Sequence, residues 1–165
     1  MEYIIRMARP EDAAAAAAIE AACFPAAEAC GLAEFKKRVS VFPESFWIAE
    51  ADGKPIGFIN GCVTDQPLLP DELYHDASLH QPDAAYQTVF GLDVVPEYQR
   101  QGIAAALLER MIADTRARGK KGSVLTCKDR LRHYYEKFGF QFRGVADSTH
   151  GGAVWNLMVL EFEEE

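Results

Sequence analysis

The chain has 165 residues, of which 49% are hydrophobic and 25% charged. This size and composition predict one folded domain over residues 1–165 and exclude a largely disordered protein. Asp and Glu outnumber Lys and Arg by 25 to 17, giving a net charge of −8, which argues against a nucleic-acid partner because such binding needs a basic surface.

The first half of the chain predicts a strand, two helices and a hairpin, in that order. Residues 2–8 form the strand, and Pro10 with two acidic residues begins a helix that continues through the alanine run. A second helix covers residues 32–42. Alternating apolar residues on both sides of Asp52-Gly53 predict the hairpin. Residues 65–85 contain three prolines and no sustained period, which indicates either a binding loop or lid, or a solvated surface excursion.

The second half predicts strands alternating with helices. Residues 86–95 form a strand, and Ile103, Leu107 and Met111 give the following helix a buried face. A strand at 123–127, a short helix at 130–138 and strands at 139–146 and 154–162 complete the chain. This order of elements indicates a mixed α/β (α+β) fold with helices on the faces of a sheet.

The four cysteines are scattered along the chain without CxxC spacing. This pattern predicts reduced thiols, a cytoplasmic protein and no metal site. The N-terminus lacks a signal-peptide pattern, and no apolar run has the length of a membrane span, so we expect no membrane partner.

The junction between the strand at 86–95 and the helix at 103 has the clearest chemical meaning. Its polar run leads to Gly102 and Ala104 at a helix N-terminus, where backbone N–H groups lack helical partners and the dipole is positive. Small residues there let a diphosphate approach the amides, and Arg100 adds a positive charge. A plain strand–turn–helix corner explains the same residues, because short glycine motifs are weakly specific.

Two motifs together resemble the GNAT superfamily of acyl-CoA-dependent N-acyltransferases. Gln99, Gly102 and Ala104 match its [Q/R]-x-x-G-x-[G/A] signature, and "HYYEKFGF" at 133–140 matches a second family element in the expected order. Segments near both ends look like the branch that contains arylalkylamine (serotonin-type) N-acetyltransferases. The resemblance implies a GNAT fold with a mostly antiparallel sheet of about six or seven strands, splayed at the cofactor site and flanked by about four helices.

The resemblance also implies roles for particular residues. The pantetheine arm of acetyl-CoA would lie beside Leu92, Asp93 and Val94, with the amide of Val94 able to polarise the acetyl carbonyl. Tyr135 matches the general acid, since a phenol stays protonated at neutral pH and can protonate the departing thiolate. The amides at the junction would bind the pyrophosphate, and these residues are Gln99, Arg100, Gln101, Gly102, Ile103, Ala104 and Ala105.

The chain departs from the vertebrate serotonin-type pattern at Thr88 and Phe90. In that branch the corresponding positions carry two histidines that help to remove the amine proton, and neither residue here is a base. The proton acceptor is therefore left open among a water chain, a carboxylate or a histidine. The candidate side chains are Asp93, Glu97, His75, His80 and His150.

The sequence thus predicts an acetyl-CoA-dependent N-acetyltransferase that acts on a primary amine, such as a small aryl- or alkylamine, by direct attack in a ternary complex. The alternatives are a protein N-terminus or lysine as acceptor, and an acyl-CoA-binding sensor without turnover. The acceptor's identity and a homodimeric state are left open.

Overall fold

The computed structural model describes residues 2–146 and 150–163. Its strands are β1 Ile4–Met7, β2 Phe46–Ala51, β3 Lys54–Asn60, β4 Val63–Thr64, β5 Tyr86–Val89, β6 Gly91–Val94, β7 Gly122–Cys127, β8 Gln141–Val145 and β9 Asn156–Glu161. Its α-helices are α1 Ala13–Cys23, α2 Leu32–Val41, α3 Asp71–His75, α4 Ile103–Ala117 and α5 Arg132–Glu136. None of the helices in these ranges is long and apolar enough to cross a membrane.

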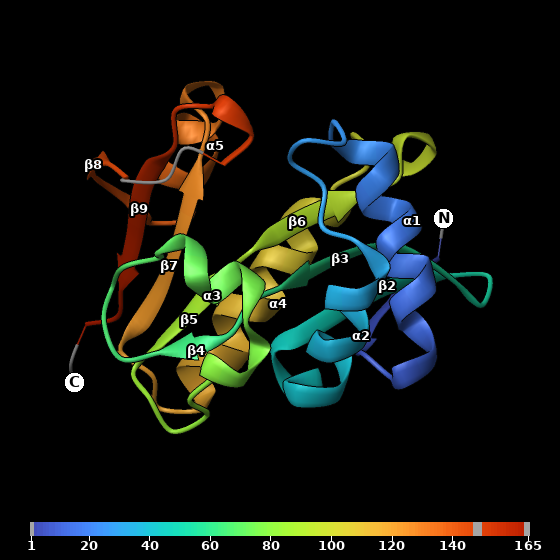
Figure 1. The fold of residues 1–165 in the computed structure, drawn as a ribbon, viewed down its shortest axis with the longest axis horizontal. Helices are drawn as coiled ribbons and strands as arrows, with labels where there is room; N and C mark the ends of the chain where they lie inside the picture. The colour runs from blue at the N-terminus through green and yellow to red at the C-terminus, as the bar shows by residue number, and fades with distance from the viewer. Residues whose placement is uncertain (1, 147–149, 164–165) are drawn as a thin grey trace.

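The strands form two sheets that separate between β6 and β7. One sheet has the order β1-β2-β3-β6, and the other has the order β4-β5-β7-β9-β8. Within the described residues only β5 and β7 pair in parallel, and the other pairs are antiparallel. Figure 1 shows β6 and β7 diverging from the region of β5, with α5 beside the far end of β7.

The predicted α+β fold and mostly antiparallel pairing are confirmed, but the single strand at 86–95 is wrong. The chain leaves one sheet after Val89 and joins the other at Gly91, because the amide of Phe90 donates to the carbonyl of Asn60 at 2.7 Å. A Cβ on Gly61 would lie 2.0 Å from the backbone oxygen of Thr88, so this crossing needs a glycine. The split accounts for one of the nine strands of the described residues, and α3 Asp71–His75 is a fifth α-helix where about four were predicted.

Helices cover both faces of the β1-β2-β3-β6 sheet. Phe46 and Phe58 pack with Phe35 of α2 in one core cluster, whereas Trp47 and Ile59 pack in another. Successive strand residues point to opposite faces, so the α1–α2 layer and α4 lie on opposite sides. The apolar residues that recur every four positions form the buried face of α4, as predicted. The fully buried apolar side chains of this helix are Ile103, Leu107, Leu108 and Met111.

Local turn chemistry produces the predicted hairpin between β2 and β3. Asp52 and Gly53 both adopt positive φ, 51° and 76°, as a two-residue hairpin turn of the primed type requires. The hairpin sets the register in which Ile48 faces Phe58. The core strands that support the candidate site therefore follow directly from a local sequence signal.

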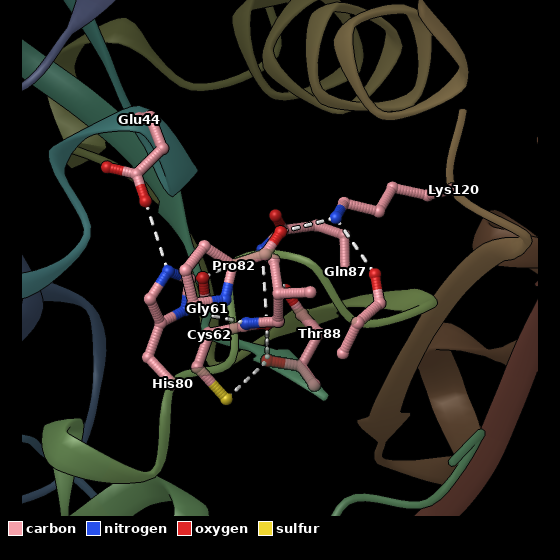
Figure 2. A network of polar contacts seen from close by, with 10 residues as sticks. Glu44, Gly61, Cys62, His80, Pro82, Gln87, Thr88 and Lys120 are labelled. Carbon is pink, nitrogen blue, oxygen red and sulfur yellow. Dashed lines mark hydrogen bonds and ion pairs between the residues drawn. The ribbon is translucent and has the colours of Figure 1, made fainter. Parts of the chain in front are cut away.

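The segment 65–85 is ordered and packs into the fold. It contains α3, and Leu69, Leu73 and Ala77 bury their side chains in the core. His80 fastens it, since its Nδ1 accepts from the amide of Val63 at 3.0 Å and its Nε2 lies 3.0 Å from Glu44 Oε1. Figure 2 shows this anchor beside the polar network around Gln87 and Thr88. Most other side chains of the segment are exposed, so it is a surface segment that is anchored at a few buried residues.

Candidate active site

The junction between β6 and α4 has the backbone geometry of an anion site. Gly102 is the N-cap of α4 with φ of 84°, and Arg100 also adopts a positive φ of 62°. The first helical bond runs from the amide of Ala106 to the carbonyl of Gly102 at 3.0 Å, so the preceding amides at the helix start lack helical acceptors. Positive φ explains the need for glycine, and no atom lies within 4 Å of the point where a Cβ would stand. The approach to the amides is therefore open.

Gln99 fixes the turn that leads to these amides. Its Nε2 donates to the carbonyl oxygen of Val94 at 2.8 Å, so the end of β6 and the start of the junction are held together. The structure thus gives the first position of the motif a supporting role through its side chain. Arg100 and Gln101 beside it are exposed.

The outer edge of β6 presents backbone groups to the gap between the sheets. The amide of Val95 donates to the carbonyl of Ile56 at 2.9 Å on β3. Backbone groups alternate in direction along an antiparallel strand, so the amides of Leu92 and Val94 point away from β3. In the described residues β7 pairs with β5 and β9, not with β6. This edge can pair with an extended chain such as the pantetheine arm, whereas the side chain of Asp93 is buried.

A cavity of about 270 Å³ lies beside this edge. Strand β6 contributes Leu92 and helix α5 contributes Tyr135, while α1, α2 and α3 contribute Glu20, Arg38 and Tyr74. The predicted donor edge and the predicted general acid thus meet at one cavity. The segment 65–85 supplies part of its wall through Tyr74, in agreement with its interpretation as part of a binding site.

Tyr135, the predicted general acid, is buried at the cavity. The side chain is 8% exposed and stacks edge-on against Phe140 with ring centroids 6.0 Å apart. No described residue hydrogen-bonds its hydroxyl. Burial, followed by the nearby Cys127, raises the pKa of Tyr135 well above its usual range. The hydroxyl therefore keeps its proton at neutral pH and is available to a group in the cavity.

Thr88 and Phe90 have structural roles at the positions where the serotonin-type branch carries histidines. Thr88 Oγ1 donates to the carbonyl of Cys62 at 2.9 Å, inside the network of Figure 2. The ring of Phe90 lies 4.7 Å from that of Tyr74 and carries the guanidinium of Arg38 at 4.5 Å. Phe90 thus supports the cavity wall, and neither a threonine hydroxyl nor a phenyl ring is a base that could take a proton from an ammonium group.

Of the other candidate proton acceptors, His80 is the one that its surroundings exclude. His80 is occupied by its two partners, and burial lowers its pKa. Glu97 is exposed on the turn before the junction. His75 lines the cavity with an exposed side chain, and the side chain of His150 lies outside the described residues.

The sequence prediction missed two buried charged residues at the cavity, Glu20 and Arg38. Glu20 is 7% exposed, and its Oε2 accepts from the amide of Cys30 at 2.6 Å. Arg38 donates to Asn60 Oδ1 at 3.1 Å and to the carbonyl of Tyr74 at 3.0 Å. The one available signal was Glu20 itself, a lone acidic residue in the otherwise apolar run of α1.

These features together define an α+β fold in which an open strand edge leads to an exposed helix N-terminus. The model of the acetyltransferase (GNAT) family matches residues 13–140, and the chain belongs to this family. Its residues are also 32% identical over 106 positions to serotonin N-acetyltransferase of Mesocricetus auratus, a match that covers 64% of this chain and 49% of the relative. The aligned region is thus about half of that relative's length.

Solved structures share the fold. The GphF GNAT-like decarboxylase in complex with isobutyryl-CoA superposes with a TM-score of 0.83 and 24% identity, over 96% of this chain and 98% of that one. An acetyltransferase structure from Salmonella typhimurium with acetyl-CoA gives a TM-score of 0.71 and 17% identity, over 99% of this chain and 95% of that one. Members of this fold thus bind acyl-CoA.

Proposed function

We propose that the protein transfers an acetyl group from acetyl-CoA to a small primary amine by direct attack in a ternary complex. The observation that carries this proposal is the protonated hydroxyl of Tyr135, which shares one cavity with the β6 edge. Acetyl-CoA supplies an activated thioester. The chain supplies the backbone beside Leu92, Asp93 and Val94 for the pantetheine arm, and the junction from Gln99 to Ala105 for the diphosphate.

Tyr135 serves this reaction as the general acid. Departure of the thiolate needs a proton, and a buried phenol with a raised pKa holds one at neutral pH. The outward amide of Val94 is placed to donate to the acetyl carbonyl. A cavity of about 270 Å³ with an acidic wall supports a small cationic amine as acceptor.

The test measures release of free thiol from acetyl-CoA with a panel of aryl amines, alkyl amines, polyamines and peptides. Tyr135→Phe should lower kcat by roughly a hundredfold, the usual contribution of a general acid, while the KM for acetyl-CoA stays near its original value. The matched control is Tyr134→Phe, because Tyr134 packs its ring on Phe138 at 5.3 Å and should change kcat by less than about threefold.

Two results would contradict the proposal. Equal rates for Tyr135→Phe and the unaltered protein would remove the general-acid role. Tight binding of acetyl-CoA with no amine acetylated by the unaltered protein would favour a sensor, and preference for peptides over small amines would favour a protein acceptor.

A further inference from the structure

Glu20 of α1 and Asp93 of β6 form a carboxyl pair at the wall of the cavity. Their side chains are 7% and 2% exposed. A Cβ added to Gly91 would lie 3.3 Å from Glu20 Oε1 and 3.3 Å from Asp93 Oδ1. The two carboxyl groups therefore converge over Gly91, where the hydrogen of a glycine leaves room for both, and no donor among the described residues hydrogen-bonds either oxygen of Asp93.

Asp93 keeps its proton at neutral pH. Burial, and then the charge of Glu20, raise the pKa of Asp93 far above its usual range, because two like charges cannot both persist in a dry site. Glu20 lines the cavity, whereas Asp93 lies behind it.

The groups around the carboxyl pair include one guanidinium, two thiols and a further carboxyl group. Arg38 acts to lower the pKa of Asp93 but makes its own hydrogen bonds to Asn60 and Tyr74. Cys23 and Cys30 stay as neutral thiols, since burial raises the pKa of each to about 11. On the facing elements, Glu34 of α2 adds a further acidic group, and Tyr135 of α5 keeps its proton.

We propose that Glu20 is the catalytic group that takes the proton from the acceptor amine, and that Asp93 is its positioning residue. This proposal rests on the acetyl transfer proposed above. Glu20 borders Gly91, at the start of the β6 edge beside which the acyl donor would lie, and it shares the cavity with Tyr135. Glu28, another acid at this cavity, is bound to Lys128 Nζ at 2.8 Å.

The proton and bond changes balance. The ammonium form of the acceptor gives one proton to the Glu20 carboxylate, and the neutral amine attacks the acetyl carbon. The new C–N bond forms and the C–S bond breaks, while the Tyr135 hydroxyl protonates the departing sulfur. A second amine proton restores Tyr135, and the carboxyl pair releases its extra proton to solvent, so each ammonium acetylated yields one free proton.

The experiment follows kcat/KM against pH with two acceptors of different basicity. Ethylamine is charged at neutral pH, whereas 2,2,2-trifluoroethylamine is already neutral there. Glu20→Gln should lower kcat/KM for ethylamine by roughly a hundredfold at neutral pH, and the rate should then rise tenfold per pH unit toward the amine pKa. For trifluoroethylamine the same variant should lose less than about threefold.

The result is the ratio of kcat/KM for the two amines, measured on the same preparation of Glu20→Gln. A smaller folded fraction of this variant lowers both values equally and leaves the ratio unchanged. The control Glu34→Gln removes one carboxylate from the same cavity and should leave the shape of the pH profile unaltered. The pH profile of the unaltered protein is a second measurement. Its kcat/KM for ethylamine should reach a plateau at a pH below the amine pKa. Equal losses for both amines in Glu20→Gln, or no plateau in the unaltered protein, would overturn the role of Glu20. A lack of acetylation with every amine would instead overturn the proposed function.

Discussion

Asp93→Asn should stabilise the protein more as the pH rises. Asp93 is 2% exposed and paired with Glu20, so its folded-state pKa lies above the unfolded value of 3.8. A carboxyl group whose pKa is raised by folding contributes stability that is full below the unfolded pKa and is lost as the pH rises toward the folded pKa. Asparagine has nearly the same shape and is neutral at every pH, so the variant does not lose stability in this way.

The size of this gain in the free energy of unfolding follows from the difference between the folded and unfolded pKa of Asp93. Each pH unit between the two pKa values costs about 1.4 kcal/mol. Neutral pH lies roughly three units above the unfolded value, so the gain from Asp93→Asn has an upper bound of about 4 kcal/mol there and falls toward zero near pH 4. Partial relaxation of the carboxyl pair reduces this gain, and we expect about 1 to 3 kcal/mol.

Urea unfolding at about pH 5, 7 and 9 measures this difference for both proteins. The matched control is Asp83→Asn, which removes an exposed carboxylate and should change the free energy of unfolding by less than about 0.5 kcal/mol at each pH. A free-energy difference for Asp93→Asn that is independent of pH, or one that becomes less favourable as the pH rises, would refute the raised pKa of Asp93.

Two further predictions concern the donor site. Arg100→Ala should raise the KM for acetyl-CoA several-fold, most strongly at low salt, with kcat nearly unchanged, because the exposed Arg100 adds charge beside the diphosphate amides; steady-state kinetics at two salt concentrations measures this. Gly102→Ala places a side chain at a φ of 84° and should cost about 1 to 2 kcal/mol of stability with a larger fractional loss of CoA affinity; thermal unfolding and titration calorimetry measure the two effects, and unchanged affinity would contradict the assigned diphosphate site.

Local signals in the sequence were sufficient for most elements. The Asp52-Gly53 turn and the four-residue period from Ile103 to Met111 are short-range patterns, and both describe the structure well. The break at Phe90 was not predictable in this way, because residues 86–95 contain no proline and are rich in β-branched and aromatic residues, as one strand would be. Its division depends on the bond to Asn60 and on the close approach of Gly61 to Thr88, which are contacts between segments distant in the sequence.

The residues of the candidate site also fall into two groups, those that local motifs predict and those that only the fold brings together. Tyr135 and the Gly102 junction follow from motifs whose residues are neighbours in the chain. The carboxyl pair does not, since Glu20 and Asp93 come from α1 and β6 and meet only when these elements pack together. The sequence showed two isolated acids, and the raised pKa of Asp93 is a property of the folded state.

The break between β5 and β6 explains why Thr88 and Phe90 stand where the serotonin-type branch carries two histidines. Thr88 ends in the polar network that holds β5 to the β3–β4 connection, and Phe90 supports Arg38 and Tyr74 at the cavity wall. These two positions are therefore committed to structure at the point where the chain passes from one sheet to the other. Gly91 follows at once and, having no side chain, leaves the space in which the two carboxyl groups converge. A proton acceptor beside the β6 edge thus depends on the packing of α1 against β6, with Gly91 as the residue that makes room for it.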